Sequence, residues 1–395
     1  MKRLNGLYNK ICTLENIELA DKNARRGKHN YGIIKHDRHS REDNERLLET
    51  LKTLSYTTSK YSKFKIFEPK ERVIFRLPYY PDRIAQWAIM NIIEHIWTST
   101  FIGHTYSCIK ERGIHKLVKD VKKALVTDKE GTTYCLKIDI RKFYPSIKHS
   151  IMKRLLRRKI KDEKLLTILD EIIDSAEGVP IGNYLSQFFA NLYLTYFDHW
   201  LLEEVHVKHY FRYADDIIVL SDNRKFLEKV LILIKIYFSS ELNIEIKPNY
   251  QIFKVEDRGI DFVGYVFFHT HTRLRKNIKQ RLFKLISKFT IGKITKEEFK
   301  KRITSYFGWL KYCNSKHLLQ KVEQKTSIHL SNWNGDEVII SNFYNKIINV
   351  IEVIKYNKYF QIHFIYKNKH YSVNSKSKKL HSRLNRIRNF KCFKL

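Results

Sequence analysis

The stretch that decides the fold is Phe211-Arg212-Tyr213-Ala214-Asp215-Asp216-Ile217-Ile218-Val219-Leu220. Two adjacent acids stand between two runs of aromatic and β-branched residues that suit strands, so the pattern predicts a hairpin with Asp215 and Asp216 at its turn. Neighbouring carboxylates on a tight turn repel each other, and a bound divalent cation is the usual compensation. Magnesium prefers oxygen ligands of this kind.

A second acid stands in a comparable place upstream. Cys135-Leu136-Lys137-Ile138-Asp139-Ile140 predicts a buried strand, within 133–140, that ends near Asp139. Two-metal phosphoryl transfer, with ions about 4 Å apart, needs carboxylates from two strands. Asp139 and Asp215 are therefore the metal-site candidates, and the adjacent Ile140 is included with them. Taken alone, either string could be a strand that ends in a solvated or capping Asp, but the two together favour a shared site.

The surrounding pattern predicts an α+β core. Apolar residues at helical spacing indicate helices, and β-branched or aromatic runs indicate strands. Helices are expected over 81–98, 146–159, 163–175, 184–203, 225–242 and, with Gly292 as a break, 276–325. Strands are expected within 56–80 and 244–268 and, after a turn at Asn334-Gly335, at 337–340, 350–354 and 361–366, followed by a basic helix at 375–389.

The charge balance indicates a polyanionic partner. The 395 residues include 75 Lys+Arg and 41 Asp+Glu, a formal net charge of +34, and such an excess attracts nucleic acid before specific contacts form. An anionic membrane surface is the alternative, but no apolar run reaches transmembrane length and residues 1–6 do not resemble a signal peptide. Five scattered cysteines show no zinc spacing. We therefore expect a cytoplasmic protein with no membrane partner.

The order of these motifs resembles the palm of reverse transcriptases, the RNA-directed DNA polymerases. The resemblance covers 56–316 and implies a right-hand polymerase architecture, with fingers and palm built on antiparallel sheet, a helical thumb and a small β-rich C-terminal appendage. The expected divisions are a basic helical extension (1–55), fingers (56–133), palm (134–270, with inserted fingers helices at 146–180), thumb (271–326) and a basic β-rich C-terminal extension (327–395).

The resemblance also implies the chemistry of the acids. Asp139 and Asp215 would hold two Mg²⁺ ions, with Mn²⁺ as an alternative, and Asp216 would support the site. Lys247 falls where the family places a lysine proposed as general acid on the leaving pyrophosphate, although a solvated strand lysine would look the same.

Further residues fall where the family binds the incoming nucleotide. Tyr144 takes the place of an aromatic gate against the ribose 2′-hydroxyl, although Tyr144 and its neighbour Phe143 could both be core aromatics. Basic residues near the fingers signature would hold the triphosphate, or else form a solvated strand face. The nucleotide-site candidates are Lys70, Arg72, Tyr144, Ile181 and Gly182.

Other positions resemble primer and template contacts. They comprise the start of the helix after Gly182, the tyrosine of the Tyr-x-Asp-Asp box, a primer-grip segment and the beginning of the thumb. These candidates are Ser186, Gln187, Tyr213, Phe262, Gly264, Arg275 and Lys276.

The biological setting is expected from the same resemblance. Ile181-Gly182-Asn183, followed by Ser186-Gln187, is similar to reverse transcriptases of diversity-generating retroelements and of bacterial antiphage defence. The leading expectation is DNA synthesis from dNTPs on a dedicated non-coding RNA in a defence system, with an accessory protein or a second copy as further partner. The alternatives are a diversity-generating retroelement, a catalytically silent RNA-binding scaffold and, disfavoured by Tyr144, an RNA-templated RNA polymerase.

Overall fold

The computed structural model describes residues 3–26, 40–67, 71–326, 349–355, 360–366, 369–375 and 392–394. The chain divides into two compact units. The first comprises residues 1–263 and 268–270, and the second comprises 264–267 and 271–395. No helix in the described part of the chain has the length and apolar character needed to cross a membrane.

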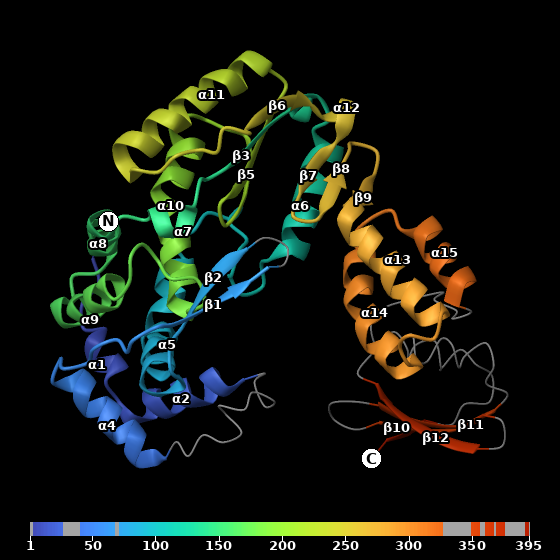
Figure 1. Cartoon of the computed structure of the whole chain (residues 1–395), viewed down its shortest axis with the longest axis horizontal. Helices are drawn as coiled ribbons and strands as arrows, with labels where there is room; N and C mark the ends of the chain where they lie inside the picture. Colours follow the sequence, from blue (N-terminus) through green and yellow to red (C-terminus); the bar gives the residue numbers. More distant parts are fainter. Residues whose placement is uncertain are drawn as a thin grey trace. The chain divides into compact units, whose positions relative to one another are not determined.

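The first unit is built on a four-stranded antiparallel sheet in the order β4-β5-β3-β6. These strands are β3 (Tyr134–Asp139), β4 (His209–Tyr213), β5 (Asp216–Ser221) and β6 (Gln251–Lys254). Residues 217–220 of β5 are all buried, a run that requires cover on both faces of the sheet. Helix α11 (Arg224–Tyr237) packs against β3, β5 and β6 (Figure 1).

Helix α10 (Tyr184–Glu203) is the most deeply buried helix of this unit's core. Its buried residues lie on nearly every side, which marks a helix enclosed by protein rather than one lying on the surface. Its buried polar residues need partners inside the protein; they are Ser186, Asn191, Thr195 and Asp198.

The other helices of the first unit surround this core. Helix α2 packs on α5, and buried residues of α1, α2 and α4 join the same hydrophobic cluster as α5 and α10. Arg25 of α2 pairs with Asp21 and lies over the Tyr79 ring. The bounds are α1 (Tyr8–Ile11), α2 (Leu14–Arg25), α4 (Arg41–Lys52), α5 (Ile84–Thr98), α6 (Ile114–Thr127), α7 (Phe143–Ser146), α8 (His149–Lys159), α9 (Glu163–Asp174) and α12 (Val255–Arg258).

Three further strands complete the first unit. A separate antiparallel hairpin is formed by β1 (Ser62–Ile66) and β2 (Arg72–Arg76), and β7 spans Ile260–Phe262. The peptide bond between Tyr80 and Pro81 is cis.

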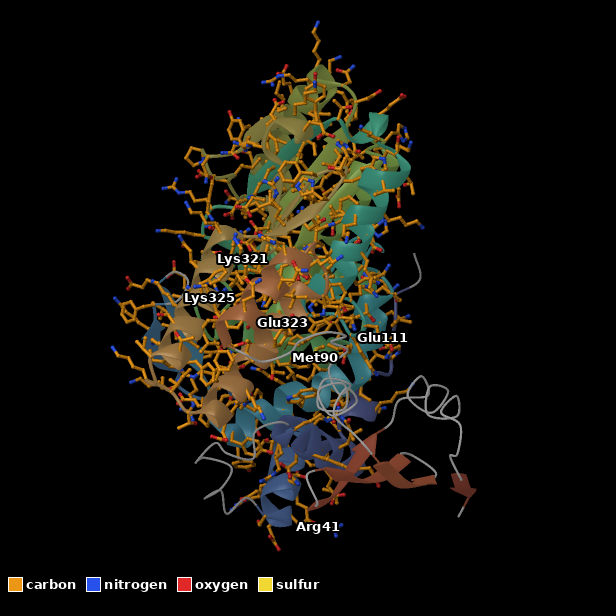
Figure 2. The ribbon with its side chains drawn as sticks, turned by 90° about the vertical axis from the view of Figure 1, so that its right-hand side faces the viewer. Arg41, Met90, Glu111, Lys321, Glu323 and Lys325 are labelled. Carbon is orange, nitrogen blue, oxygen red and sulfur yellow. The ribbon has the colours of Figure 1, made fainter. Side chains whose placement is uncertain are left out.

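The second unit contains helices, a short hairpin and a four-stranded sheet. The hairpin strands are β8 (Tyr265–Phe267) and β9 (Thr272–Leu274), and the helices are α13 (Lys276–Thr290), α14 (Lys296–Leu310) and α15 (Lys316–Thr326). Helix α15 buries Val322 and exposes Lys321 and Lys325 (Figure 2). The sheet order is β12-β11-β10-β13, with β10 (Asn349–Lys355), β11 (Phe360–Tyr366), β12 (Lys369–Ser375) and β13 (Cys392–Lys394).

The predicted α+β class is confirmed, since helices pack on antiparallel sheets in the described residues. Two local predictions need correction. The strand-like segment 244–268 is interrupted by the helical turn α12, and Ser375 ends strand β12 instead of starting a helix. The predicted strand at 337–340 and the remainder of the predicted helix at 375–389 lie outside the described residues.

Candidate active site

The acids predicted to form the site are brought together by strand register. Asp139, the last residue of β3, is the Cα partner of Asp216, the first residue of β5. Asp215 precedes Asp216 in the turn that joins β4 to β5. That turn places Ala214 in the left-handed region, at φ 54°, a conformation that residues with a Cβ atom seldom adopt.

The environment of Asp215 makes its carboxyl group harder to ionise than it is in water. Burial, and then the negative charges of Asp216 and Asp139, raise its pKa from 3.8 to about 6. A carboxylate placed among like charges in a desolvated site favours either a proton or a bound cation.

Lys247 lies directly beside Asp139. Its ammonium group forms an ion pair with Asp139 Oδ2, and its backbone N–H donates to the Asp139 carbonyl oxygen at 2.8 Å. Ile140 follows with a fully buried side chain and bridges to Ile246. The segment at 246–247 therefore holds the end of β3 in place.

The carboxylates fit a hard divalent cation. Asp139 Oδ1 is buried and has no hydrogen-bond partner among the described residues, although its neighbour Oδ2 is paired with Lys247. The described residues contain no group of three His, Cys, Asp or Glu side chains arranged around one point. A magnesium-type ion does not require one, because it is commonly held by one or two carboxylates and keeps several waters.

The neighbouring aromatic residues Phe143 and Tyr144 differ in how deeply they are buried. Phe143 is buried and packs edge-to-face against Tyr193, 6.4 Å between ring centroids, so it belongs to the core. Tyr144 is only partly buried. Burial raises the pKa of its hydroxyl, with contributions from Cys108 and Asp215, so Tyr144 lies within electrostatic range of the turn that carries Asp215.

The loop before α10 is fastened to the β1–β2 hairpin. The Phe75 N–H donates to the Ile181 carbonyl at 2.8 Å. Gly182 has φ 125°, and a Cβ atom there would lie 2.5 Å from the Phe75 carbonyl oxygen. Close approach of strand β2 is therefore a sufficient physical reason for glycine at 182.

The remaining candidates in the first unit vary in accessibility. Ser186 and Phe262 are buried, Gln187 and Tyr213 are partly buried, and Arg72 is exposed at the start of β2. Lys70 lies outside the described residues. The Phe262 side chain is core, so any contact of this segment with nucleic acid would use its backbone.

In the second unit, Gly264 is held against Trp309. Gly264 has φ 91°, and a Cβ atom there would overlap the Trp309 ring, which also packs on Tyr265 at 5.3 Å. The Arg275 N–H donates to the Gly264 carbonyl at 2.9 Å, and exposed Lys276 begins α13.

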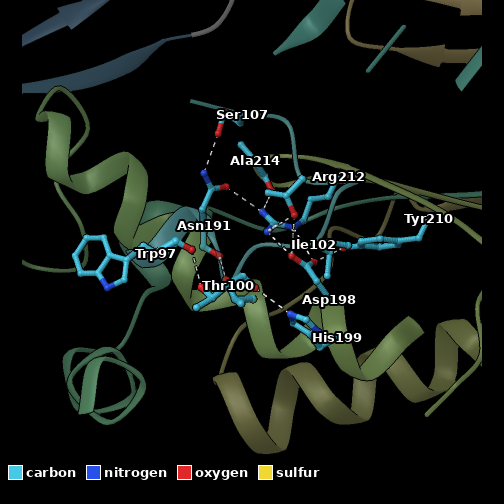
Figure 3. Close-up of polar contacts among 12 residues, drawn as sticks. Trp97, Thr100, Ile102, Ser107, Asn191, Asp198, His199, Tyr210, Arg212 and Ala214 are labelled. Carbon is cyan, nitrogen blue, oxygen red and sulfur yellow. Dashed lines mark hydrogen bonds and ion pairs between the residues drawn. The ribbon is translucent and has the colours of Figure 1, made fainter. Parts of the chain in front are cut away.

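One part of the site was missed from the sequence. Arg212 of β4 is fully buried and forms an ion pair with the fully buried Asp198 of α10 (Figure 3). The signal was present, because Arg212 directly follows Tyr210 and Phe211, the buried aromatic residues of β4. A charge in that position needs a partner in the protein interior.

Comparisons with known proteins agree with this geometry. The family model described as reverse transcriptase (RNA-dependent DNA polymerase) matches residues 63–267. Protein YkfC of Escherichia coli (strain K12) is 29% identical over 155 residues, covering 35% of this chain and 40% of that protein. The retron Ec73 reverse transcriptase of Escherichia coli is 25% identical over 300 residues, covering 70% of this chain and 89% of that protein.

Two further similarities are more limited. The group II intron-encoded protein LtrA of Lactococcus lactis subsp. cremoris is 23% identical over 180 residues, covering 42% of this chain and 29% of that protein. The matches thus span less than half the length of YkfC and LtrA. Apo telomerase from Candida tropicalis shares 14% identity at a TM-score of 0.46, covering 73% of this chain and 59% of that one.

Proposed function

The chain belongs to the reverse transcriptase family, whose model matches residues 63–267 of its 395, and from this premise we propose that it synthesises DNA on an RNA template. The observation that carries the proposal is the strand register that sets Asp139 opposite Asp216, with Asp215 in the adjoining turn. This register brings acidic residues from two strands together, which supports the proposal because two-metal nucleotidyl transfer needs carboxylates from separate strands.

Asp139 and Asp215 are the proposed ligands of two Mg²⁺ ions, for which Mn²⁺ is an alternative, and the Ile140 carbonyl is a further candidate ligand. Bound there, the ions would supply Lewis-acid stabilisation of the charge that develops during transfer. The raised pKa of Asp215 and the unpartnered Asp139 Oδ1 support this assignment.

The chain's own groups have separate proposed roles. Asp216 supports the turn beside Asp215. Lys247 holds Asp139 as an ion pair and, once released from that pair, would donate a proton to the leaving pyrophosphate. Tyr144 would exclude the ribose 2′-hydroxyl, because its partly buried ring lies within electrostatic range of Asp215.

The proposed nucleic-acid contacts lie around the acids in the sequence. Lys70 and the exposed Arg72 would contact the triphosphate, and the backbone at 181–182 would face the incoming nucleotide. The proposed primer and template contacts are Ser186, Gln187, Tyr213, Phe262, Gly264, Arg275 and Lys276.

The proposed template is a dedicated non-coding RNA, and the proposed setting is bacterial antiphage defence. The net charge of +34 supports binding of a large RNA, and similarity to the reverse transcriptase of a retron over 300 residues supports a retroelement-type enzyme. The second candidate is a diversity-generating retroelement, favoured by the sequence Ile181-Gly182-Asn183 followed by Ser186-Gln187.

The experiment compares the wild-type protein with Asp215→Ala/Asp216→Ala, each purified from the natural locus, and sequences the nucleic acid that co-purifies. A discrete RNA with complementary DNA in wild type, and the RNA alone in the variant, supports the proposal and identifies the template. Identical nucleic acid in both preparations would contradict it and favour an RNA-binding scaffold.

A further inference from the structure

The buried side chain of Arg212 reaches the turn at 214–215 that joins β4 to β5 and carries Asp215, here named the catalytic turn. Its Nη1 donates to the Ala214 carbonyl oxygen at 3.1 Å and to Asn191 Oδ1 at 3.2 Å. Its Nε donates to both Asp198 oxygens, at 2.8 and 3.1 Å, and Nη2 donates to Asp198 Oδ2 (Figure 3). One guanidinium therefore joins helix α10 to the residue that precedes Asp215.

The carbonyl that receives this hydrogen bond belongs to a strained residue. Ala214 has φ 54°, in the left-handed region that a Cβ atom disfavours. Such a conformation persists only where the surrounding structure holds it. The bond from Arg212 is a direct contact with the peptide group that joins Ala214 to Asp215.

The far side of the guanidinium is fixed from several directions. Asp198 also accepts hydrogen bonds from the Tyr210 hydroxyl and, at 3.2 Å, from Thr105 Oγ1. The Arg212 backbone N–H donates to the His104 carbonyl at 3.0 Å. The side chain therefore has little freedom to follow the turn if the turn moves.

Stability alone is a weak reason for this arrangement. A buried ion pair loses much of its attraction to desolvation, and apolar residues of similar volume often stabilise a core as well or better. An apolar residue at 212, however, would donate no hydrogen bond to Ala214. Arginine donates to Asp198, Asn191 and Ala214 from three nitrogen atoms of one planar group. The single ammonium nitrogen of lysine does not reproduce that geometry.

We infer that Arg212 is a positioning residue for the catalytic turn, acting through the Ala214 carbonyl to fix where the Asp215 carboxylate lies. Asp198 and Asn191 orient its guanidinium. This inference rests on the proposed polymerase function and adds a specific mechanical requirement to it. Arg212 contacts neither template nor nucleotide in this account.

The test compares Arg212→Lys with wild type in single-turnover primer extension on an RNA template. The extension rate should fall on the order of 100-fold, as expected when a catalytic group is misplaced by about 1 Å. The dissociation constants for primer–template and dNTP should not change. Hydrogen exchange of the amides at 213–216 should become faster, a readout independent of activity.

Arg157→Lys is the matched control. Arg157 forms a two-point pair with Asp170, at 3.0 and 2.6 Å, between α8 and α9 and without contact to the catalytic turn. The same substitution there should leave both the extension rate and the exchange at 213–216 unchanged.

A second variant tests the same inference if Arg212→Lys does not fold. Arg212→Met/Asp198→Asn removes both buried charges together and keeps an amide oxygen for the Tyr210 hydroxyl, so no charge is left unpaired. A folded double variant that extends slowly and exchanges rapidly at 213–216 supports the inference.

A wild-type extension rate in either folded variant would overturn the positioning role, as would equal losses in Arg212→Lys and Arg157→Lys. Failure of the wild-type protein to extend any primer is a different result. That outcome would reject the proposed function itself.

Discussion

At the residue scale, the main feature of the site is a partly buried carboxyl group, that of Asp215, close to other negative charges. Burial and then the charges of two neighbouring acids raise the pKa of Asp215 to about 6, so its ionisation costs more in the metal-free protein than in water. A group in this state gains most from a bound cation, which is consistent with a proposed ligand role.

Asp215→Asn should stabilise the metal-free protein above pH 6. Because the folded-state pKa lies above the unfolded value of 3.8, the cost of ionising Asp215 is absent below about pH 3.8 and complete above about pH 6. Stability therefore falls as pH rises through this interval. A difference of about two pKa units sets the upper limit of the gain on the order of 3 kcal/mol.

Urea unfolding in EDTA at pH 7.5 and pH 4 measures this gain, with the exposed Asp257→Asn as control. The expected result is a gain for Asp215→Asn at pH 7.5 that diminishes at pH 4, and no gain for the control. Equal stability of wild type and Asp215→Asn at pH 7.5 would contradict the like-charge account.

Tyr144→Ala should increase ribonucleotide incorporation, because removal of the ring opens the space proposed to exclude the 2′-hydroxyl. The measurement is the ratio of kcat/KM for ribonucleotide and deoxynucleotide. Phe143→Leu is the control, since the buried Phe143 ring packs on Tyr193. It should lower stability without changing sugar selectivity. An unchanged ratio in Tyr144→Ala would remove the gate assignment.

At the element scale, sequence periodicity predicted the parts that carry continuous apolar patterns. Helix α10 was expected over 184–203 and occupies Tyr184–Glu203, and the hairpin of β4 and β5 was expected around Asp215. Interruptions were harder to predict. Helix α12 spans only Val255–Arg258, too few residues to establish a helical period.

Side-chain pairing between distant elements was not predictable from local pattern. Arg212 and Asp198 are 14 residues apart, on a strand and a helix, and only the tertiary fold brings them together. The proximity of Asp139 and Asp215 was easier to predict from the sequence. Asp139 ends strand β3 and Asp215 directly precedes strand β5 of the same sheet. The approach of Gly182 to a nucleotide stays a prediction. The tertiary structure adds a constraint that the sequence did not show, since a Cβ atom at Gly182 would lie 2.5 Å from the Phe75 carbonyl oxygen.

Gly182→Ala should destabilise the junction between β2 and the start of α10. The added Cβ would lie 2.5 Å from the Phe75 carbonyl oxygen, and the residue has φ 125°. Backbone strain of this kind costs about 1–3 kcal/mol, and the clash adds to it. Gly113→Ala is the control, because Gly113 has φ 94° but a Cβ atom added there would meet no heavy atom within 4 Å.

Denaturant unfolding measures the free energy of unfolding of both alanine variants. Both carry the cost of a positive φ, but only Gly182→Ala also carries the clash with Phe75. The greater loss should occur in Gly182→Ala. Equal losses in the two variants would show that close approach of β2 does not determine the glycine at 182.

At the scale of the whole molecule, the dominant property is charge. A formal net charge of +34 on 395 residues gives a field that attracts any polyanion. Binding to RNA should therefore release counterions and depend steeply on salt. Specificity for one RNA must come from other contacts.

RNA affinity should fall about 1,000-fold between 50 and 200 mM salt, the loss expected for six or more phosphate contacts. Filter binding or fluorescence anisotropy with the full chain and a structured RNA measures it. A loss of less than about tenfold would indicate that only a few phosphates are contacted, and that the excess charge serves another purpose.

The most direct test of the central claim is primer extension by the purified full chain, with an annealed DNA primer on an RNA template, dNTPs and Mg²⁺. Wild type should produce complementary DNA of template length, and Asp139→Asn should produce none while binding the primer–template normally. Absence of wild-type product with both Mg²⁺ and Mn²⁺, or equal extension by Asp139→Asn, would contradict the account.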